Sequence, residues 1–260
     1  MKSKKLKKWT TLLTCATALT VMTACSQSSS QSTGTTSSTT SKTSAVTATT
    51  SKKTNKNNNS NSNYFTSKDS DTSYNESSAT KIKLSGSSAD VSGDGAALSG
   101  STVTISKAGT YVISGKSDGV QIKVDAGDSD DVHIVLDGAT MTNTNAAINA
   151  TKAGHVYLTL KDGTTNTLSD SSSNSDEDAD AVIFSKGDLT INGTGTLNID
   201  AKKNNGIKAN DSLHITGGTY KISSVGDAFN VNDELNITGT TMTIEAEEDG
   251  VKVDNDDDTK

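Results

Sequence analysis

A phrase of about 22 residues recurs in the last third of the chain, and this period restricts the possible folds more than any other feature of the sequence. It reads NGIKANDSLHIT from Asn205, DAFNVNDELNIT from Asp227 and DGVKVDND from Asp249. Each unit contains short runs in which apolar and polar residues alternate, separated by Gly, Asn, Asp or Ser. Alternation with a period of two predicts β-strands, and a fixed period of this length predicts a solenoid.

Three strands and three bends in each unit make one turn of a parallel β-helix, so the predicted fold class is all-β. Matching letters of successive units then stack, and one side of each strand faces a shared apolar interior. Tyr220 is expected in this interior rather than as a sugar-stacking ring. The absence of proline suits continuous ladders, and a flat β-sandwich is the structural alternative. The expected inward columns are Leu189, Leu213 and Leu235; Leu197, Tyr220 and Met242; and Val182, Ile207, Phe229 and Val251.

The chain is predicted to have three parts. Residues 1–24 begin with lysines followed by an apolar stretch, which is typical of a signal peptide, and the letters MTAC ending at Cys25 resemble a bacterial lipobox. That resemblance implies lipid attachment to Cys25 and anchoring at the extracellular face of the bacterial cell membrane; an ordinary secretory signal is the alternative. Residues 25–80 are rich in Ser, Thr, Asn and Lys and are expected to form a disordered tether. Residues 81–260 form the expected domain, and its last turn starts without finishing, as in a fragment or a shortened solenoid.

Two irregular stretches are expected within this domain. Residues 81–100 fit the repeat loosely and are expected to cap its first end. The acidic stretch TLSDSSSNSDED at residues 167–178 interrupts a unit and is expected as a loop at one corner.

Charge and cysteine content exclude some functions. The net charge is −7, and removal of five signal-peptide lysines leaves 19 lysines against 31 acidic residues, or −12. Nucleic acid is therefore not an expected partner. Of the two cysteines, Cys15 lies in the signal peptide and Cys25 is the expected lipid site, so no disulfide is expected in the domain.

Acidic and amide residues recur at the corners of the predicted turns. Carboxylates about 4.8 Å apart repel one another, and a Ca²⁺ ion with oxygen ligands at about 2.3–2.6 Å fits between them. A hydrated acidic corner without an ion is the alternative, and the loop from Asp176 to Asp180 is a weaker candidate. The expected calcium ligands are Asp227, Asp249, Asn205, Asp211, Asp233 and Asp254.

The first strand of each unit also has an outward face. If Ile207, Phe229 and Val251 point inward, the residues between them form a polar stripe along the long axis. Such a stripe suits a long, hydroxyl-rich and sometimes acidic polysaccharide; ordinary surface residues are the alternative. The expected carbohydrate-binding residues are Lys208, Asn230, Lys252, Asn210 and Asn232.

The three repeat phrases, extended to NGIKANDSLHITGGTYKI and DAFNVNDELNITGTTMTI, resemble the calcium-binding carbohydrate-binding domain typified by a surface protein of a cellulolytic clostridium. The resemblance covers about residues 81–260 and implies a right-handed parallel β-helix similar to pectate lyases. It also implies binding of cellulose and polygalacturonate. The lone Trp9 lies in the signal peptide, which departs from an expectation of stacking on crystalline cellulose.

The predicted function is a lipid-anchored extracellular module that binds pectin-, polygalacturonate- or cellulose-like polysaccharide and is stabilised by Ca²⁺. An adhesin or surface scaffold is one alternative. A calcium-dependent polysaccharide lyase is another, and it needs a base to remove a proton. The chain has no arginine, which leaves Lys208 and Lys252 as formal candidates for that base. An enzymatic activity is therefore not the favoured interpretation.

Overall fold

The computed structural model describes residues 64–254, and within this range the protein is all-β, with twenty strands and no helix. In this part of the chain, no helix is long and apolar enough to cross a membrane. The strands are β1 (Thr80–Gly86), β2 (Ser88–Ser92), β3 (Ala96–Ser99), β4 (Thr102–Ile105), β5 (Gly109–Asp118), β6 (Gln121–Asp125), β7 (Asp131–Thr142), β8 (Ile148–Lys152), β9 (His155–Leu160), β10 (Thr165–Ser169), β11 (Ala181–Ser185), β12 (Leu189–Gly193), β13 (Thr196–Ala201), β14 (Asn205–Ala209), β15 (Leu213–Thr216), β16 (Thr219–Ser224), β17 (Phe229–Val231), β18 (Leu235–Thr238), β19 (Thr241–Ala246) and β20 (Lys252–Val253).

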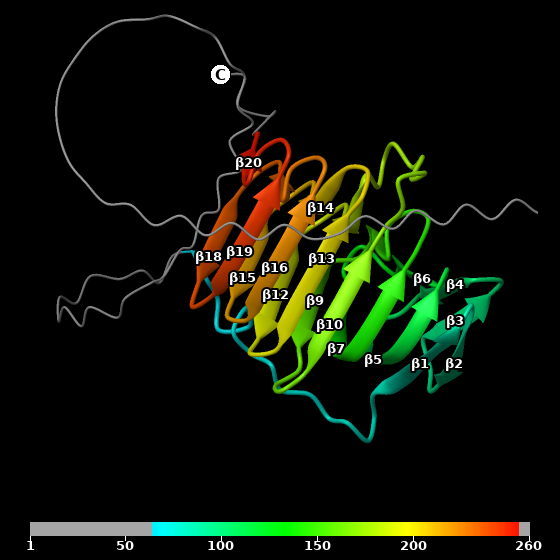
Figure 1. The fold of residues 1–260 in the computed structure, drawn as a ribbon. Coiled ribbons are helices and arrows are strands. Elements are labelled where there is room, and N and C mark those ends of the chain that lie inside the picture. Colours follow the sequence, from blue (N-terminus) through cyan, green and yellow to red (C-terminus); the bar gives the residue numbers. More distant parts are fainter. Residues whose placement is uncertain (1–63, 255–260) are drawn as a thin grey trace, which may run out of the picture. The chain divides into compact units, whose positions relative to one another are not determined.

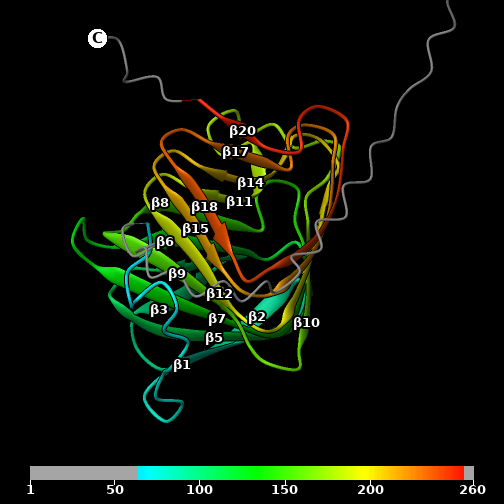
Figure 2. The ribbon, with the colours of Figure 1, turned by 90° about the vertical axis from the view of Figure 1, so that its left-hand side faces the viewer.

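The strands form two sheets that curl around a shared apolar interior as a half-barrel (Figures 1 and 2). Sheet A has the order β18-β15-β12-β9-β7-β10-β13-β16-β19, with β5, β1 and β2 attached through β7. Sheet B has the order β20-β17-β14-β11-β8-β6-β4-β3. From β11 onward each turn of the chain places one strand in sheet B and the next two in sheet A. The predicted stacking of three-strand units is therefore present, and the right-handed β-helix stays a prediction.

The repeat period appears directly as strand register. Leu213 pairs with Leu235, and Tyr220 pairs with Met242, in parallel ladders. Tyr220 is 1% exposed and Phe229 is fully buried, so both belong to the core, as predicted. Stacking is needed because a single turn cannot bury its own apolar side chains.

One predicted column is wrong by one residue. Ile183, rather than Val182, pairs with Ile207. Every residue of β11 is buried, because Phe184 on its outer side packs against alanines that include Ala179 of the preceding loop. A strand buried on both faces has no alternation, and without alternation the sequence does not fix the phase of the strand.

The first end of the fold is closed differently from the rest. The β1–β2 and β3–β4 pairs are antiparallel, whereas all other strand pairs in the described range are parallel. These two hairpins span residues 80–105 and include residues 81–100, where the sequence predicts an imperfect first turn. A hairpin at the end of a parallel stack covers an edge that would otherwise remain unpaired.

Residues 64–79, here called the strap, lie against sheet A, although the sequence assigns them to the tether. Asp69 is 2% exposed, and side chains of β12 and β15 hydrogen-bond to it. Tyr74 packs on Val112 and Val135. The polar composition suggests a tether, but these few long-range contacts hold the segment in place, so the tether prediction does not apply from residue 64 onward. Cys25 and the rest of the predicted signal peptide and tether lie outside the described residues.

Candidate functional site

The predicted stripe is assembled on the outer side of sheet B. Lys208 pairs in register with Asn230, and Asn230 pairs with Lys252, so the three side chains follow one another across β14, β17 and β20. Parallel strands lie about 4.8 Å apart, which places the side chains in a regular row. Lys208 and Asn230 are half-buried and Lys252 is exposed.

Each member of this row already has an acidic partner. Lys208 Nζ donates to Asp180 Oδ1 at 2.7 Å, and Lys252 Nζ lies 3.1 Å from Asp254 Oδ2. The hydrogen bond to Asp254 raises the pKa of Lys252. The raised pKa keeps the Lys252 ammonium group protonated, which suits binding better than proton removal.

Asn205, Asp227 and Asp249 form a hydrogen-bonded ladder along the start of β14 and the turns stacked on it. Asn205 Oδ1 accepts from the N–H of Asp227 at 2.9 Å, and Asp227 Oδ1 accepts from the N–H of Asp249 at 3.1 Å. Asn230 Nδ2 donates to the other carboxylate oxygen of Asp227 at 2.7 Å. Each side chain thus binds the backbone of the following turn, which gives the repeated Asn/Asp position a structural role.

The other predicted calcium ligands lie at the opposite end of the same strands, together with two of the predicted carbohydrate-binding residues. The backbone N–H groups of Asn210, Asn232 and Asp254 bond to the carbonyls of the preceding turn after β14, β17 and β20. The side chains of Asp211 and Asp233 on this corner are exposed. A five-residue strand spans roughly 16 Å, so the two corners cannot share one ion. Within residues 64–254, no group of three or more His, Cys, Asp or Glu side chains is arranged so that it could hold a metal ion.

A second polar surface, which the sequence analysis does not predict, lies on the outer side of sheet A. Its central row runs in register from His133 through Tyr157 and Thr190 to His214. All three histidines of the chain lie on this face, because His155 begins the strand that carries Tyr157. Burial lowers the pKa of His133 and of His155. These side chains are partly buried because the strap covers them.

The strap holds Asp69 against this face, where it is 2% exposed and contacts Thr190 of β12. Thr190 Oγ1 donates to Asp69 Oδ1 at 2.7 Å, and Thr66 donates to Asp69 Oδ2 through its backbone N–H and its hydroxyl. Burial raises the pKa of Asp69, but the hydrogen bonds from Thr190 and Thr66 and the nearby His214 outweigh burial, so its pKa lies below the ordinary value. Asp69 is therefore a buried and ionised carboxylate.

The alternating runs DVHIVLD, HVYLTL and LHIT contain a signal for this face, because they place His133, Tyr157 and His214 at outward positions. Three separate runs with ring side chains facing outward indicate a covered or functional surface. The covering segment could not be inferred, since residues 64–79 show no periodicity.

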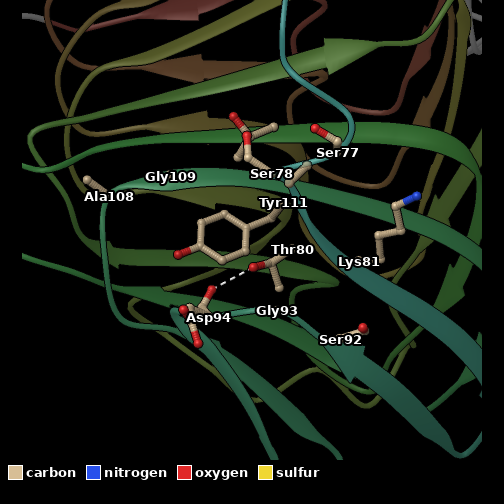
Figure 3. A pocket seen from close by; sticks show the side chains of 12 residues that line it. Ser77, Ser78, Thr80, Lys81, Ser92, Gly93, Asp94, Ala108, Gly109 and Tyr111 are labelled. Atoms are coloured by element: carbon tan, nitrogen blue, oxygen red, sulfur yellow. Dashed lines mark hydrogen bonds between the residues drawn. The ribbon is translucent and has the colours of Figure 1, made fainter.

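A cavity of about 580 Å³ lies at the first end of the fold, near Tyr111 and Thr80 (Figure 3). Tyr111 donates its hydroxyl to the carbonyl of Lys107 at 2.7 Å, and Thr80 donates to the carbonyl of Asp94 at 2.6 Å. Burial raises the pKa of Tyr111. Because these hydroxyl protons are already used by backbone carbonyls, the cavity is a weaker candidate than the two sheet surfaces.

Comparisons with known proteins give a consistent result. Residues 99–260 match a family described as "Carbohydrate-binding domain-containing protein". A protein of that description from Acetivibrio thermocellus is 38% identical over 137 residues, which are 50% of this chain and 48% of the relative. The chain thus spans about half the length of this curated relative. A solved structure described as a polysaccharide lyase-like protein from C. thermocellum, in a gadolinium derivative, is similar with a TM-score of 0.57 and 25% identity, over 67% of this chain and 94% of that chain.

Proposed function

The chain belongs to the family of carbohydrate-binding domain-containing proteins, and from this premise we propose that it is a polysaccharide-binding module for pectin-, polygalacturonate- or cellulose-like chains. The observation that carries the proposal is the row Lys208–Asn230–Lys252, in which amide and ammonium donors repeat along the stack. A polymer with regularly spaced hydroxyl or carboxylate groups can meet such a row at several points.

The charge pairs in the stripe do not exclude an acidic ligand. Lys252 and Asp254 are both exposed to solvent, and exposed ion pairs of this kind are weak. A uronate carboxylate can therefore compete for the ammonium group. A lyase would need an unprotonated base, and the raised pKa of Lys252 argues for binding rather than catalysis.

The double variant Asn230→Ala, Lys252→Ala is expected to lower affinity for polygalacturonate about tenfold, because two hydrogen-bonding groups are lost. Isothermal titration and co-sedimentation with pectin and cellulose measure the effect. The matched control is Lys221→Ala, Thr243→Ala, which removes an exposed in-register pair from sheet A. Equal binding by the two double variants would contradict the assignment of the stripe, and retention of no polysaccharide by the full chain would favour an adhesin or scaffold.

The proposal includes a calcium ion at the column of Asn205, Asp227 and Asp249. Its support is the donor chemistry, since carboxylate and amide oxygens are the ligands that Ca²⁺ prefers. The column supplies two carboxylates, and both oxygens of Asp227 and the amide oxygen of Asn205 already accept hydrogen bonds. Backbone carbonyls or water would have to complete the coordination.

Calcium at a hundredfold excess over its dissociation constant is expected to raise the melting temperature by about 5–10 °C relative to chelator, because binding to the folded state alone stabilises it. Asp249→Asn is expected to remove most of this increase, whereas Asp200→Asn, an exposed carboxylate outside the column, is expected to keep it. Thermal unfolding followed by circular dichroism gives the comparison. A melt that does not respond to chelator would exclude this site.

The proposal also includes a right-handed parallel β-helix and a lipid anchor at Cys25 on the extracellular face of the bacterial cell membrane. The parallel register between successive turns supports the first part. The lipobox-like letters that end at Cys25 support the second.

A further inference from the structure

Around Asp69, the hydrogen bonds between the strap and sheet A all run from donors on the sheet to acceptors on the strap. Thr190 Oγ1 donates to Asp69 Oδ1 at 2.7 Å, and His214 Nδ1 lies 3.3 Å from the same oxygen. Asn192 Nδ2 donates to the carbonyls of Asp69 and Asp71, at 3.1 Å in both cases. Around Asp69 the sheet thus supplies donors and the strap supplies acceptors, whereas Lys68 of the strap pairs with Asp131 of β7.

These donors are oriented by residues of the sheet itself. Thr159 Oγ1 donates to Asn192 Oδ1 at 2.6 Å, so the amide protons of Asn192 face outward. His133 Nε2 lies 2.7 Å from Thr159 Oγ1, and His155 Nε2 lies 2.9 Å from Thr190 Oγ1. A hydroxyl has a single proton to donate, so each imidazole donates to its threonine. Neighbouring side chains of the sheet therefore orient Asn192 without help from the strap, and His155 supports Thr190 while Thr190 donates to Asp69.

The strap leaves part of this face unfilled. A cavity of about 230 Å³ lies beside Asp69 and is bordered by Asp188, Ser212 and His214. His155 and Tyr157 also line it and stack on each other, with ring centroids 4.1 Å apart and an interplanar angle of 14°. A carboxylate position next to ring side chains and a few polar groups is typical of a ligand site.

We propose that this face of sheet A is a second binding groove, specific for a uronate-bearing polysaccharide, and that the strap occupies it in cis with Asp69 in the place of a uronate carboxylate. The inference rests on the proposed polysaccharide binding and adds a substrate class to it. The ligand carboxylate meets Thr190 and His214, hydroxyl oxygens of the sugar accept from Asn192, and the sugar ring fills the cavity beside Tyr157. An acidic peptide offers the carboxylate and the carbonyls but has no sugar ring for that cavity.

The strap competes with the ligand because it is part of the same chain and its local concentration is high. A polysaccharide binds only the fraction of molecules in which the strap is released, so its apparent affinity falls by that fraction. Weakening the strap should therefore strengthen binding of the polysaccharide.

The test uses the full chain with Asp69→Ala and, as the matched control, Asp71→Ala. The Asp71 carboxylate hydrogen-bonds to Ser73 within the strap, whereas the Asp69 carboxylate binds the groove. Asp69→Ala is expected to raise affinity for oligogalacturonate about tenfold, and Asp71→Ala is expected to change it by less than about twofold, because a charge-assisted hydrogen bond to sheet A is lost only in the first variant. Isothermal titration measures both.

A second pair of variants keeps the test decisive. Adding Asn192→Ala to Asp69→Ala is expected to abolish the gain. If circular dichroism shows that Asp69→Ala does not fold, Lys68→Ala replaces it, since Lys68 pairs with Asp131 and lies 4.6 Å from the Tyr157 ring centroid at the exposed side of the strap. Unchanged affinity in these strap variants overturns the proposal, and an equal gain for poly-aspartate overturns the polysaccharide assignment.

The stripe variant separates the two proposals. Asn230→Ala, Lys252→Ala combined with Asp69→Ala is expected to keep the gain that Asp69→Ala produces. If the unaltered chain binds through the stripe and Asp69→Ala does not raise the affinity, only the proposal of a second groove is wrong. If no variant binds any polysaccharide, the proposed function itself fails.

Discussion

Replacing Gly193 with alanine is expected to lower the free energy of unfolding by about 3 kcal/mol or more, through backbone strain and a steric clash together. Gly193 ends β12 with φ +98°, and an added Cβ would lie 2.2 Å from the carbonyl oxygen of Leu160. Leu160 is paired with Gly193 in the ladder between β9 and β12, so neither backbone can move away without breaking that ladder. Urea denaturation followed by circular dichroism measures the loss.

Gly239→Ala is the matched control for this substitution. Gly239 also has a positive φ, +66°, but the nearest atom to an added Cβ is 3.9 Å away. The control should therefore lower the free energy of unfolding only by the cost of a left-handed backbone for alanine, about 1–2 kcal/mol. Similar losses at both positions would show that the close approach of β9 and β12 does not constrain the fold.

Replacing Phe229 with alanine is expected to cost about 3–5 kcal/mol, because it removes a large side chain from a closely packed interior. Phe229 is fully buried in β17 and stacks on Ile207 of the preceding turn. The corresponding decrease in melting temperature is about 6–20 °C for a domain of this size. Differential scanning calorimetry measures it.

Phe65→Ala makes the same chemical change outside the core. Phe65 lies in the strap and meets His214 edge-on, with ring centroids 5.6 Å apart. Loss of this ring should affect the strap, and it should change the free energy of unfolding of the two sheets by less than about 1 kcal/mol. A large decrease for Phe65→Ala and a small one for Phe229→Ala would contradict the predicted stacking of turns.

The sequence predicts the repeating part of the fold well. A period of 22 residues and two-residue alternation are enough to place Leu213 over Leu235 and Tyr220 over Met242, as the ladders confirm. Stacking converts a spacing in sequence into a neighbour in space, so few other facts are needed. The same logic fails at Val182, where a loop covers the outer face of β11 and removes the alternation.

The candidate sites could be predicted only in part. The row Lys208–Asn230–Lys252 follows from register alone, and its alignment is confirmed. The ion pair between Lys208 and Asp180 was not predictable, because Asp180 belongs to the irregular loop before β11. The strap was missed for a related reason: Asp69 bonds to Thr190, 121 residues away, and no periodicity links them.

The regular spacing of successive turns has a consequence for which ligands the proposed stripe would prefer. Each added turn contributes one more side chain to the row. If the stripe binds a glycan as proposed, the number of contacts would grow in equal steps along the length of the row. Weak contacts that repeat on one rigid support strengthen one another when a single molecule spans them. Under the proposed function, such a surface would select ligands by length: it would retain polymers and release short fragments built from the same sugar.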